Sequence, residues 1–542
     1  MNSSAPAVRL NVSSGGARQS PSAEDVRIAA IDIGSNSIRQ IIADVSAGGS
    51  IRVVNEMKAA PRLGQAVEQT GELSATAMLE AIASLNRMAT LARQLNAKRI
   101  EAVATSAVRE AANGRAFLDL VKAETGLRVK VITGDDEARL SFRSALAHFD
   151  LGQGRAVVMD IGGGSLELAL SADGLVEHLI SLPFGAIRLT EEYLTNRPPR
   201  KGMKKLRKLV RREIANRISA RDWRGAQVIC SGGTFTNLAG IHLSRQGLRS
   251  AQTVHGTVVP RGELEHILDM LHAMSPPERA TVPGLNAARA DIIVAGLAVA
   301  AEVMARLEAR ELVVSGYGIR EGLLLEAARV TAVPADPGNA RQRSVRELAE
   351  RSSYEAPHGK HVRKLALQLF DAIGTRLGCN KSDRQILGDA ALLHDIGYHI
   401  NYDKHHKHSY HLIQHAELLG MTPAEQIAVA NVARYHRGAE PQKKHLNYRA
   451  LDSDWRETVV RLAAILRVAD GFDRGHDGAV DSLKVRWTQR ALRITAVPNP
   501  KAVSVRLDLW GASRKSRLLA DVADTIVEIV APDGRVLTYD DA

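Results

Sequence analysis

The stretch that decides the fold runs from Val157 to Leu170 and reads Val-Val-Met-Asp-Ile-Gly-Gly-Gly-Ser-Leu-Glu-Leu-Ala-Leu. An apolar run typical of a buried strand ends in Asp160, three glycines and Ser165, and an alternating strand then carries Glu167. The tip of the expected hairpin lacks side-chain bulk, so successive backbone N–H groups can close around an anion. The stretch therefore predicts an anion-binding turn between two strands.

The same design occurs about one subdomain upstream. Residues 28–33 form an apolar run that contains Asp32, the turn 34–37 (Gly-Ser-Asn-Ser) follows, and a second apolar run continues to Val45. Two strand–Asp-x-Gly–turn–strand units predict two loops that face each other across a cleft, each holding phosphate. Strands that end in glycine-rich turns recur at 228–234 and 312–318, which indicates two matching halves and hence a duplicated α/β domain.

The length and composition of the chain limit the number of domains and the kinds of partner that we expect. A chain of 542 residues is too long for one core, and about three or four domains are expected. The net charge of +12 indicates an anionic partner, and the presence of only 2 cysteines fits a reducing compartment, for which we expect the cytoplasm. No uncharged apolar run is long enough to span a membrane, so no membrane partner is expected.

The pattern along the chain divides it into six parts. Residues 1–25, rich in Ser, Ala and Gly, are expected to form a disordered tail. In the last part we expect strands at 483–487, 492–497 and 503–509, followed by a helix that leads into 526–530, and we assign this part no chemistry. The other expected ranges are 26–150 and 151–330 for the two α/β subdomains, 331–345 for a Pro/Gly linker, 346–480 for a helical domain and 481–542 for a small α/β C-terminal domain.

Six motifs, in order and with suitable spacing, resemble the exopolyphosphatase/guanosine pentaphosphate phosphohydrolase (Ppx/GppA) family. The resemblance covers residues 26 to about 330 and implies a phosphoanhydride hydrolase with a duplicated actin-like ATPase (ribonuclease H-like) fold. One departure is that aspartates stand at 135 and 136, where many members carry glutamates. The motifs are Asp32-x-Gly34-Ser35-Asn36-Ser37, Thr105-x-x-x-Arg109, Glu137-Ala138-Arg139, Asp160-Ile161-Gly162-Gly163-Gly164-Ser165-x-Glu167, Ser231-Gly232-Gly233-Thr234 and Ser315-Gly316-Tyr317-Gly318-x-Arg320-Glu321-Gly322.

Hydrolysis of a terminal phosphoanhydride requires donors for a dense anion and a base for the attacking water. Glu137 is the candidate base, and Arg109 is expected to supply a bidentate positive charge. The alternative to a catalytic role is that the acidic residues 135–137 cap the start of a helix. The expected phosphate-binding residues are Gly34, Ser35, Asn36, Ser37, Gly163, Gly164 and Ser165.

Three carboxylates in the same motifs predict a magnesium site. Asp32, Asp160 and Glu167 offer the hard oxygen ligands that Mg²⁺ prefers. The expected cofactor is therefore Mg²⁺, with Mn²⁺ as the alternative divalent ion and K⁺ as a further candidate. The alternative interpretation of Asp32 and Asp160 is that each is a turn residue whose side chain hydrogen-bonds its own backbone.

From Arg346 to about Asp473, histidines gather in a helical pattern that resembles the HD superfamily of metal-dependent phosphohydrolases. Such imidazole and carboxylate groups suit a divalent transition metal or Mg²⁺. An all-α HD-like domain that only helps to bind polymer and to dimerise is the alternative. The ligand set that the resemblance implies is His361, His394, Asp395 and Asp470.

A basic helix is expected over 197–212, with Met203, Leu206 and Val210 in its buried stripe. A solvated helix face is the usual interpretation of such a run. The alternative is a track for a long polyanion. The residues of that track would be Lys204, Lys208 and Arg211.

Together these features favour an exopolyphosphatase that processively removes terminal phosphate from inorganic polyphosphate and forms a homodimer. Within the same chemistry, the 5′-phosphate of pppGpp is the alternative substrate. A sensor whose HD-like domain binds a nucleotide such as pppGpp or ppGpp is an alternative of another class, as are an actin-like kinase or ATPase and a nucleic-acid binder. The low aromatic content, 4% of residues, offers few stacking platforms for single strands and disfavours the last.

Overall fold

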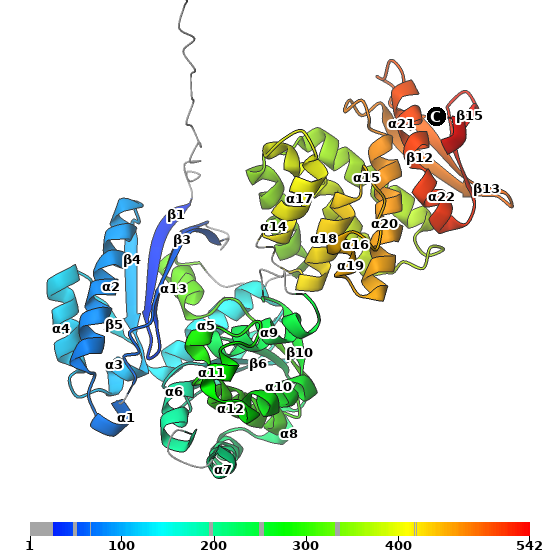
Figure 1. Ribbon diagram of the computed structural model, residues 1–542. Coiled ribbons are helices and arrows are strands. Elements are labelled where there is room, and N and C mark those ends of the chain that lie inside the picture. Colours follow the sequence, from blue (N-terminus) through cyan, green and yellow to red (C-terminus); the bar gives the residue numbers. More distant parts are fainter. Residues whose placement is uncertain are drawn as a thin grey trace, which may run out of the picture.

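The computed structural model describes residues 25–46, 51–65, 67–194, 199–248, 254–330, 337–416, 418 and 420–541. The expected disordered tail, apart from Asp25, lies outside these residues, and so does the first part of the expected linker, 331–336. Figure 1 shows two α/β subdomains followed by a helical domain that carries a small C-terminal sheet. Within the described ranges, no helix combines the length and apolar character needed to cross a membrane.

The first sheet has the strand order β3-β2-β1-β4-β5 and is built on the buried apolar run of β1. β1 and β2 are antiparallel with Ile33 opposite Ile38, so residues 34–37 close a tight turn. β4 runs parallel to β1 with Ala104 beside Ile33, which brings Thr105 to the same sheet edge. The elements are β1 (Val26–Ile33), β2 (Ile38–Val45), β3 (Ile51–Ala59), α1 (Val67–Thr70), α2 (Ala75–Gln94), β4 (Arg99–Ala104), α3 (Ser106–Glu110), α4 (Gly114–Thr125), β5 (Val129–Val131) and α5 (Gly134–His148).

The second sheet repeats this plan in the order β10-β11-β9-β6-β7-β8. β6 and β7 are antiparallel with Ile161 opposite Leu166, and β9 runs parallel to β6 with Ser231 beside Asp160. The elements are β6 (Arg155–Ile161), β7 (Leu166–Ala172), β8 (Leu175–Leu182), α6 (Ala186–Leu189), η1 (Thr190–Leu194), α7 (Pro199–Arg217), α8 (Ala220–Trp223), β9 (Gln227–Ser231), α9 (Gly233–Arg245), β10 (Thr257–Pro260), α10 (Arg261–Ala273), α11 (Pro276–Arg279), η2 (Ala287–Arg289), α12 (Ile293–Arg306), β11 (Glu311–Val314) and α13 (Ile319–Ala327).

One helix from each half packs on the sheet of the other half. On α5, Ala138 and Phe142 share a core cluster with Val158 of the second sheet. On α13, Leu324 belongs to a core cluster that also contains Ile28 of the first sheet. The matching sheets and the exchanged helices join the halves at the sheet edge where both turns lie. This arrangement confirms the predicted duplicated actin-like fold.

The helical domain and the C-terminal sheet share one hydrophobic core, in which residues such as Phe472 pack with Ile494 and Ile529. The sheet has the order β12-β13-β14-β15. The elements are α14 (Pro337–Arg351), α15 (Ala356–Ile373), α16 (Lys381–Leu393), η3 (Ile396–His399), α17 (His405–Gln414), α18 (Pro423–Arg434), α19 (Leu446–Arg449), α20 (Ser453–Gly471), β12 (Val480–Trp487), β13 (Ala491–Pro498), α21 (Arg506–Lys515), α22 (Arg517–Ala523), β14 (Ile526–Val530), β15 (Val536–Leu537) and η4 (Tyr539–Asp541).

Two expectations about these parts are wrong. The expected linker 331–345 overlaps α14, because Val345, Leu348 and Ala349 lie on one helical face and enter the core. The expected strand 503–509 overlaps α21: the apolar residues alternate along the sequence, yet burial follows the helical spacing of Leu509 and Ala512.

Candidate active site

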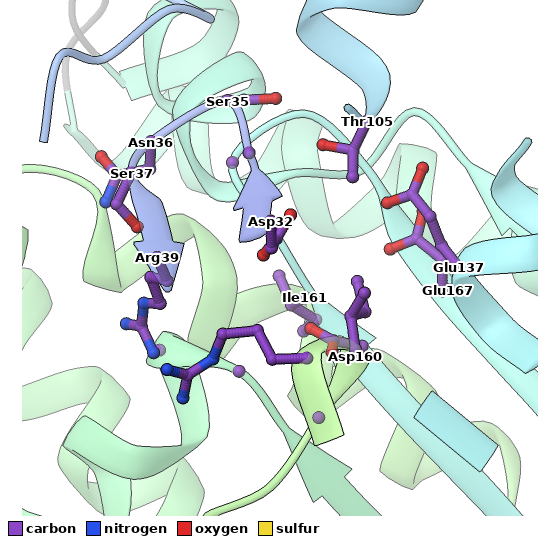
Figure 2. A pocket seen from close by; sticks show the side chains of 18 of the residues that line it. Asp32, Ser35, Asn36, Ser37, Arg39, Thr105, Glu137, Asp160, Ile161 and Glu167 are labelled. Atoms are coloured by element: carbon purple, nitrogen blue, oxygen red, sulfur yellow. The ribbon is translucent and has the colours of Figure 1, made fainter. Parts of the chain in front are cut away.

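A cleft of about 110 Å³ between the two subdomains brings the two predicted turns together (Figure 2). A Cβ atom on Gly163 would lie 3.0 Å from Ser35 Cβ and 3.1 Å from Asn36 N, and one on Gly164 would lie 2.2 Å from Ser106 Oγ. Only residues without a side chain allow this approach. The expected phosphate-binding residues of both turns, 34–37 and 163–165, therefore line one cleft.

Three carboxylates gather at the floor of the cleft. Asp32 comes from β1 and Asp160 from β6, and Glu167 stands opposite Asp160 across the β6–β7 pair. Asp160 Oδ2 accepts hydrogen bonds from Ser231 Oγ at 2.7 Å and from Ser141 Oγ at 3.2 Å. Asp32 Oδ1 is buried and has no hydrogen-bond partner among the described residues. The set thus offers carboxylate oxygens that are not already used by protein donors.

Burial raises the pKa of all three groups. Desolvation lifts the pKa of Asp32 to about 6, against the lowering effect of the Arg39 and Arg320 charges. The pKa of Asp160 is also raised by burial, and that of Glu167 is raised well above its usual range by burial and by the nearby Glu137. Clustered carboxylates of this kind are stabilised in their charged form by a bound cation. The residues fit the divalent ion that the sequence predicted.

Glu137 lies in the first turn of α5. Two nearby residues, and not Glu137 itself, cap this helix. Thr133 and Asp136 form a reciprocal capping box, so the acidic run divides into a cap and a buried carboxyl group. Glu137 is 3% exposed and lies beside Glu167 in the cleft (Figure 2). Burial raises the pKa of Glu137 to about 7, although its hydrogen bond from Arg109 lowers it.

Arg109 is not among the residues that line the cleft. Its Nη1 donates hydrogen bonds to Glu137 Oε1 at 2.7 Å and to the carbonyl oxygen of Ile132 at 2.6 Å. In this structure the Arg109 guanidinium is engaged in an ion pair with the candidate base, and its expected contact with phosphate stays a prediction.

Three arginines that were not expected at the site from the sequence also line the cleft: Arg39, Arg289 and Arg320. Arg320 stands inside one of the quoted motifs, and Arg39 follows the first turn by two residues, so both had a local signal. Arg289 had none, because it lies before α12 and reaches the cleft only through the fold. Its guanidinium passes so close to Gly233 that a Cβ there would lie 2.0 Å from Arg289 Cζ.

The histidine cluster of the helical domain differs from the expected one by one residue. His394, Asp395 and Asp470 come together, but His361 lies outside the cluster, with its Nε2 2.8 Å from the carbonyl oxygen of Val480. His358, one helical turn earlier on α15, takes its place. The expectation for His361 is corrected accordingly, because the exact helical phase is set by packing.

The basic helix is α7, and its predicted apolar stripe is buried. Lys204 and Lys208 are exposed. Arg211 donates to both carboxylate oxygens of Glu302 on α12, with Nε 2.8 Å from Oε2. One of the three residues of the expected polyanion track is thus engaged in an ion pair within the subdomain.

Comparison with known proteins identifies both parts of the chain. The model of the Ppx/GppA phosphatase family matches residues 41–330, and that of Ppx/GppA phosphatase, domain III, matches residues 340–499. Exopolyphosphatase 1 of Mycobacterium leprae is 33% identical over 308 residues, which are 55% of this chain and 89% of that protein. Exopolyphosphatase 1 of Mycobacterium tuberculosis is 31% identical over 303 residues, 55% of this chain and 88% of that protein.

Solved structures agree with this result. The crystal structure of an exopolyphosphatase-like protein is 29% identical, with a TM-score of 0.52, and the match covers 56% of this chain and 98% of that one. An exopolyphosphatase from Cytophaga hutchinsonii is 24% identical, with a TM-score of 0.51 and coverage of 57% and 99%, and it supports the fold alone. The similarity thus lies in the part of the chain that forms the cleft.

Proposed function

The chain belongs to the Ppx/GppA phosphatase family, and on this premise we propose that it hydrolyses the terminal phosphate of inorganic polyphosphate in the cleft. The observation that carries the proposal is the position of Glu137. Its carboxyl group is buried beside the glycine turns and has a pKa of about 7. A general base works best when its pKa is close to the operating pH.

The anion is held by neutral donors and by fixed positive charge. Backbone N–H groups of the turns 34–37 and 163–165 bind the phosphoryl oxygens without adding charge of their own. Arg39, Arg289 and Arg320 line the same cleft and neutralise the phosphates that follow along the chain. These arginines take the role that the sequence analysis gave to Arg109.

Asp32, Asp160 and Glu167 would hold Mg²⁺, for which Mn²⁺ is a substitute. The buried Asp32 Oδ1, which has no hydrogen-bond partner among the described residues, fits this role. When bound, the ion supplies positive charge against the phosphoryl oxygens. It would also offset the desolvation of the charged carboxylates, which is the main cause of their raised pKa values.

Glu137 takes one proton from a water molecule as the water oxygen forms a bond to the terminal phosphorus. The bond from that phosphorus to the bridging oxygen breaks, and the shortened polyphosphate leaves with the bonding electron pair. Arg109 acts through Glu137: it lowers the pKa of the carboxyl group and keeps a fraction of it ionised at neutral pH. Arg109 is accordingly a positioning residue.

The test is phosphate release from long-chain polyphosphate with Mg²⁺ by the wild type and by the variant Glu137→Gln. We expect release to fall by about a hundredfold or more in the variant while polymer still binds. Asp135→Asn is the matched control, because Asp135 lies in the same helical turn but is exposed. Release from pppGpp is measured in parallel. Faster turnover of pppGpp than of polyphosphate would replace the proposed substrate, and full activity of Glu137→Gln would overturn the proposed base.

A further inference from the structure

Three aromatic rings from distant parts of the chain pack together beside the cleft. Tyr317 belongs to the turn between β11 and α13, and it lines the cleft together with its two glycine neighbours. The imidazole of His148 stacks on the Tyr317 ring, with centroids 4.1 Å apart and planes 14° apart. The imidazole of His255 meets the same ring edge-on, with centroids 4.8 Å apart. The cleft turn 315–318 is therefore held by two histidines that lie outside it.

The pairing of β10 with β11 brings His255 to this turn. The two strands are antiparallel with Thr257 opposite Val314, so the residues just before β10 lie beside those just after β11. Gly256 N donates a hydrogen bond to the carbonyl oxygen of Val314 at 2.8 Å. The contact that follows is close, because a Cβ on Gly316 would lie 3.4 Å from His255 Cβ.

His255 also accepts a hydrogen bond from the turn. Gly316 N donates to His255 Nδ1 at 3.3 Å. A histidine Nδ1 can accept only when the imidazole is neutral and its proton is on Nε2. Burial, and secondly the neighbouring His148, lowers the pKa of His255 to about 3. The imidazole of His255 is therefore a neutral acceptor for this backbone N–H group near neutral pH.

His148 joins the turn to the helix that carries the proposed base. His148 and Glu137 lie at opposite ends of α5. The Nδ1 atom of His148 lies 2.7 Å from the carbonyl oxygen of Ser144, which fixes the ring on the helix. α5 and α13 are also in close backbone contact, since a Cβ on Gly322 would lie 2.1 Å from the carbonyl oxygen of Leu140. The base and the turn are thus parts of one packed unit.

The turn 315–318 in its place determines the position of two groups in the cleft. Gly318 lies against the floor of the cleft, where a Cβ on it would be 3.7 Å from Asp160 Oδ2. Arg320 follows in the first turn of α13 and lines the cleft. Burial raises the pKa of Asp32, and the charge of Arg320 is one of two that oppose this rise. A displaced turn would therefore move both the backbone beside Asp160 and the charge that stabilises ionised Asp32.

The segment 254–256 contacts the helical domain on another side. A Cβ on Gly256 would lie 3.6 Å from the carbonyl oxygen of Met421, in the helical domain. Leu248, which follows α9, packs against the hydrophobic core of that domain. His255 thus lies between the turn of the cleft and a segment that the helical domain supports.

We propose that His255 is a positioning residue, which holds the turn 315–318 against Asp160, and that the helical domain supports it through the segment 254–256. His255 acts through the turn, since it is not among the residues that line the cleft. The role proposed for His255 in turnover rests on the function proposed for the cleft.

The first experiment separates the hydrogen bond from the bulk of the ring. His255→Phe keeps a ring without an acceptor, whereas His255→Asn places an oxygen near the position of Nδ1. We expect kcat/KM for phosphate release from long-chain polyphosphate to fall about tenfold in His255→Phe. In His255→Asn it should stay within about threefold of the wild type. His266→Phe, at an exposed histidine of α10, is the control and should behave as the wild type. Wild-type activity of His255→Phe, or an equal loss in both His255 variants, would overturn the positioning role.

The second experiment measures the turn without any substrate. Amide hydrogen exchange is followed by mass spectrometry in the wild type and His255→Phe. We expect exchange to be about fivefold faster in the turn 315–318 and unchanged in the turn 34–37. Equal exchange in the two proteins would overturn the positioning role. If exchange differs as expected but the wild type releases no phosphate from polyphosphate, the function proposed for the cleft fails and the support of the turn by His255 stands.

The third experiment tests the part of the helical domain. Leu248→Ser weakens the contact with that domain, and Leu79→Ser, at an exposed leucine of α2, is the control. We expect Leu248→Ser to lower kcat/KM and to speed exchange in the turn 315–318. It should have no further effect in a protein that already carries His255→Phe, because both changes act through the same turn. Independent, additive effects of the two substitutions would overturn the support by the helical domain.

Discussion

Arg109 Nη1 lies 2.7 Å from Glu137 Oε1, which joins the end of α3 to the start of α5 in an ion pair at the edge of the cleft. The partner carboxyl group is buried and the arginine is partly exposed. Burial and this ion pair act in opposite directions on the pKa of Glu137, which comes to about 7. The proposed base is thus tuned by one neighbour that does not line the cleft.

We expect the kcat/KM for polyphosphate to rise with pH through about 7, because Glu137 must be ionised to accept a proton. In Arg109→Gln the acidic limb of this profile moves to higher pH, since the charge that lowers the pKa of Glu137 is gone. The control is Arg139→Gln, because Arg139 forms an exposed ion pair on α5, the helix that carries Glu137. We expect this variant to leave the acidic limb in place. An unshifted limb in Arg109→Gln would show that the ion pair does not tune the base.

Asp32→Asn should stabilise the protein in the absence of divalent metal while abolishing activity. Burial raises the pKa of Asp32 from 3.8 to about 6, so the folded state gives up its proton less readily than the unfolded state. The stabilisation from this proton is complete below pH 3.8 and is lost as pH rises through about 6. The wild type loses about 3 kcal/mol of its free energy of unfolding at most, and Asp32→Asn avoids this loss.

The measurement is chemical denaturation of both proteins at pH 4 and pH 8, with a chelator and then with Mg²⁺. We expect the advantage of Asp32→Asn at pH 8 to shrink when Mg²⁺ is added, because the ion stabilises only the wild-type carboxylate. A variant that is less stable than the wild type at pH 8 without metal would contradict this account.

Gly164→Val should lower phosphate release by about tenfold or more with little loss of fold. A Cβ at this position meets Ser106 Oγ at 2.2 Å and Ser35 Oγ at 3.0 Å, so the two turns must move apart. Gly262→Ala is the control: its Cβ would meet nothing within 4 Å, and helix propensity favours alanine there. Steady-state rates and circular dichroism of both variants test the prediction, and normal turnover by Gly164→Val would exclude a role for the close approach.

The double variant Lys204→Gln, Lys208→Gln should bind long-chain polyphosphate more weakly and with a flatter salt dependence. Both residues are exposed on α7, so they are free to meet a polyanion. Arg211→Gln should instead act on stability, since Arg211 is paired with Glu302. Binding of long and short polyphosphate at several salt concentrations separates these effects. Unchanged long-chain affinity of the double variant at low salt would rule out the track.

The cleft was predictable because its determinants are local. A strand that ends in Asp160 and three glycines dictates a turn with free backbone donors, and the same holds for Asp32 and the turn that follows it. Backbone conformation depends on neighbours in the chain, so such turns can be recognised without knowing the fold. The repeat of the pattern was sufficient to predict the duplicated architecture.

Other features depended on packing between distant segments. The ion pair of Arg109 with Glu137, the entry of Arg289 into the cleft and the joining of Lys515 to the histidine cluster each link residues far apart in sequence. No local pattern encodes such distances. His358 replaces His361 for a related reason: both lie on α15, and only the packing of that helix decides which one faces Asp395. Local backbone preferences are written in short stretches of the chain, whereas the meeting of side chains at a site depends on the whole core.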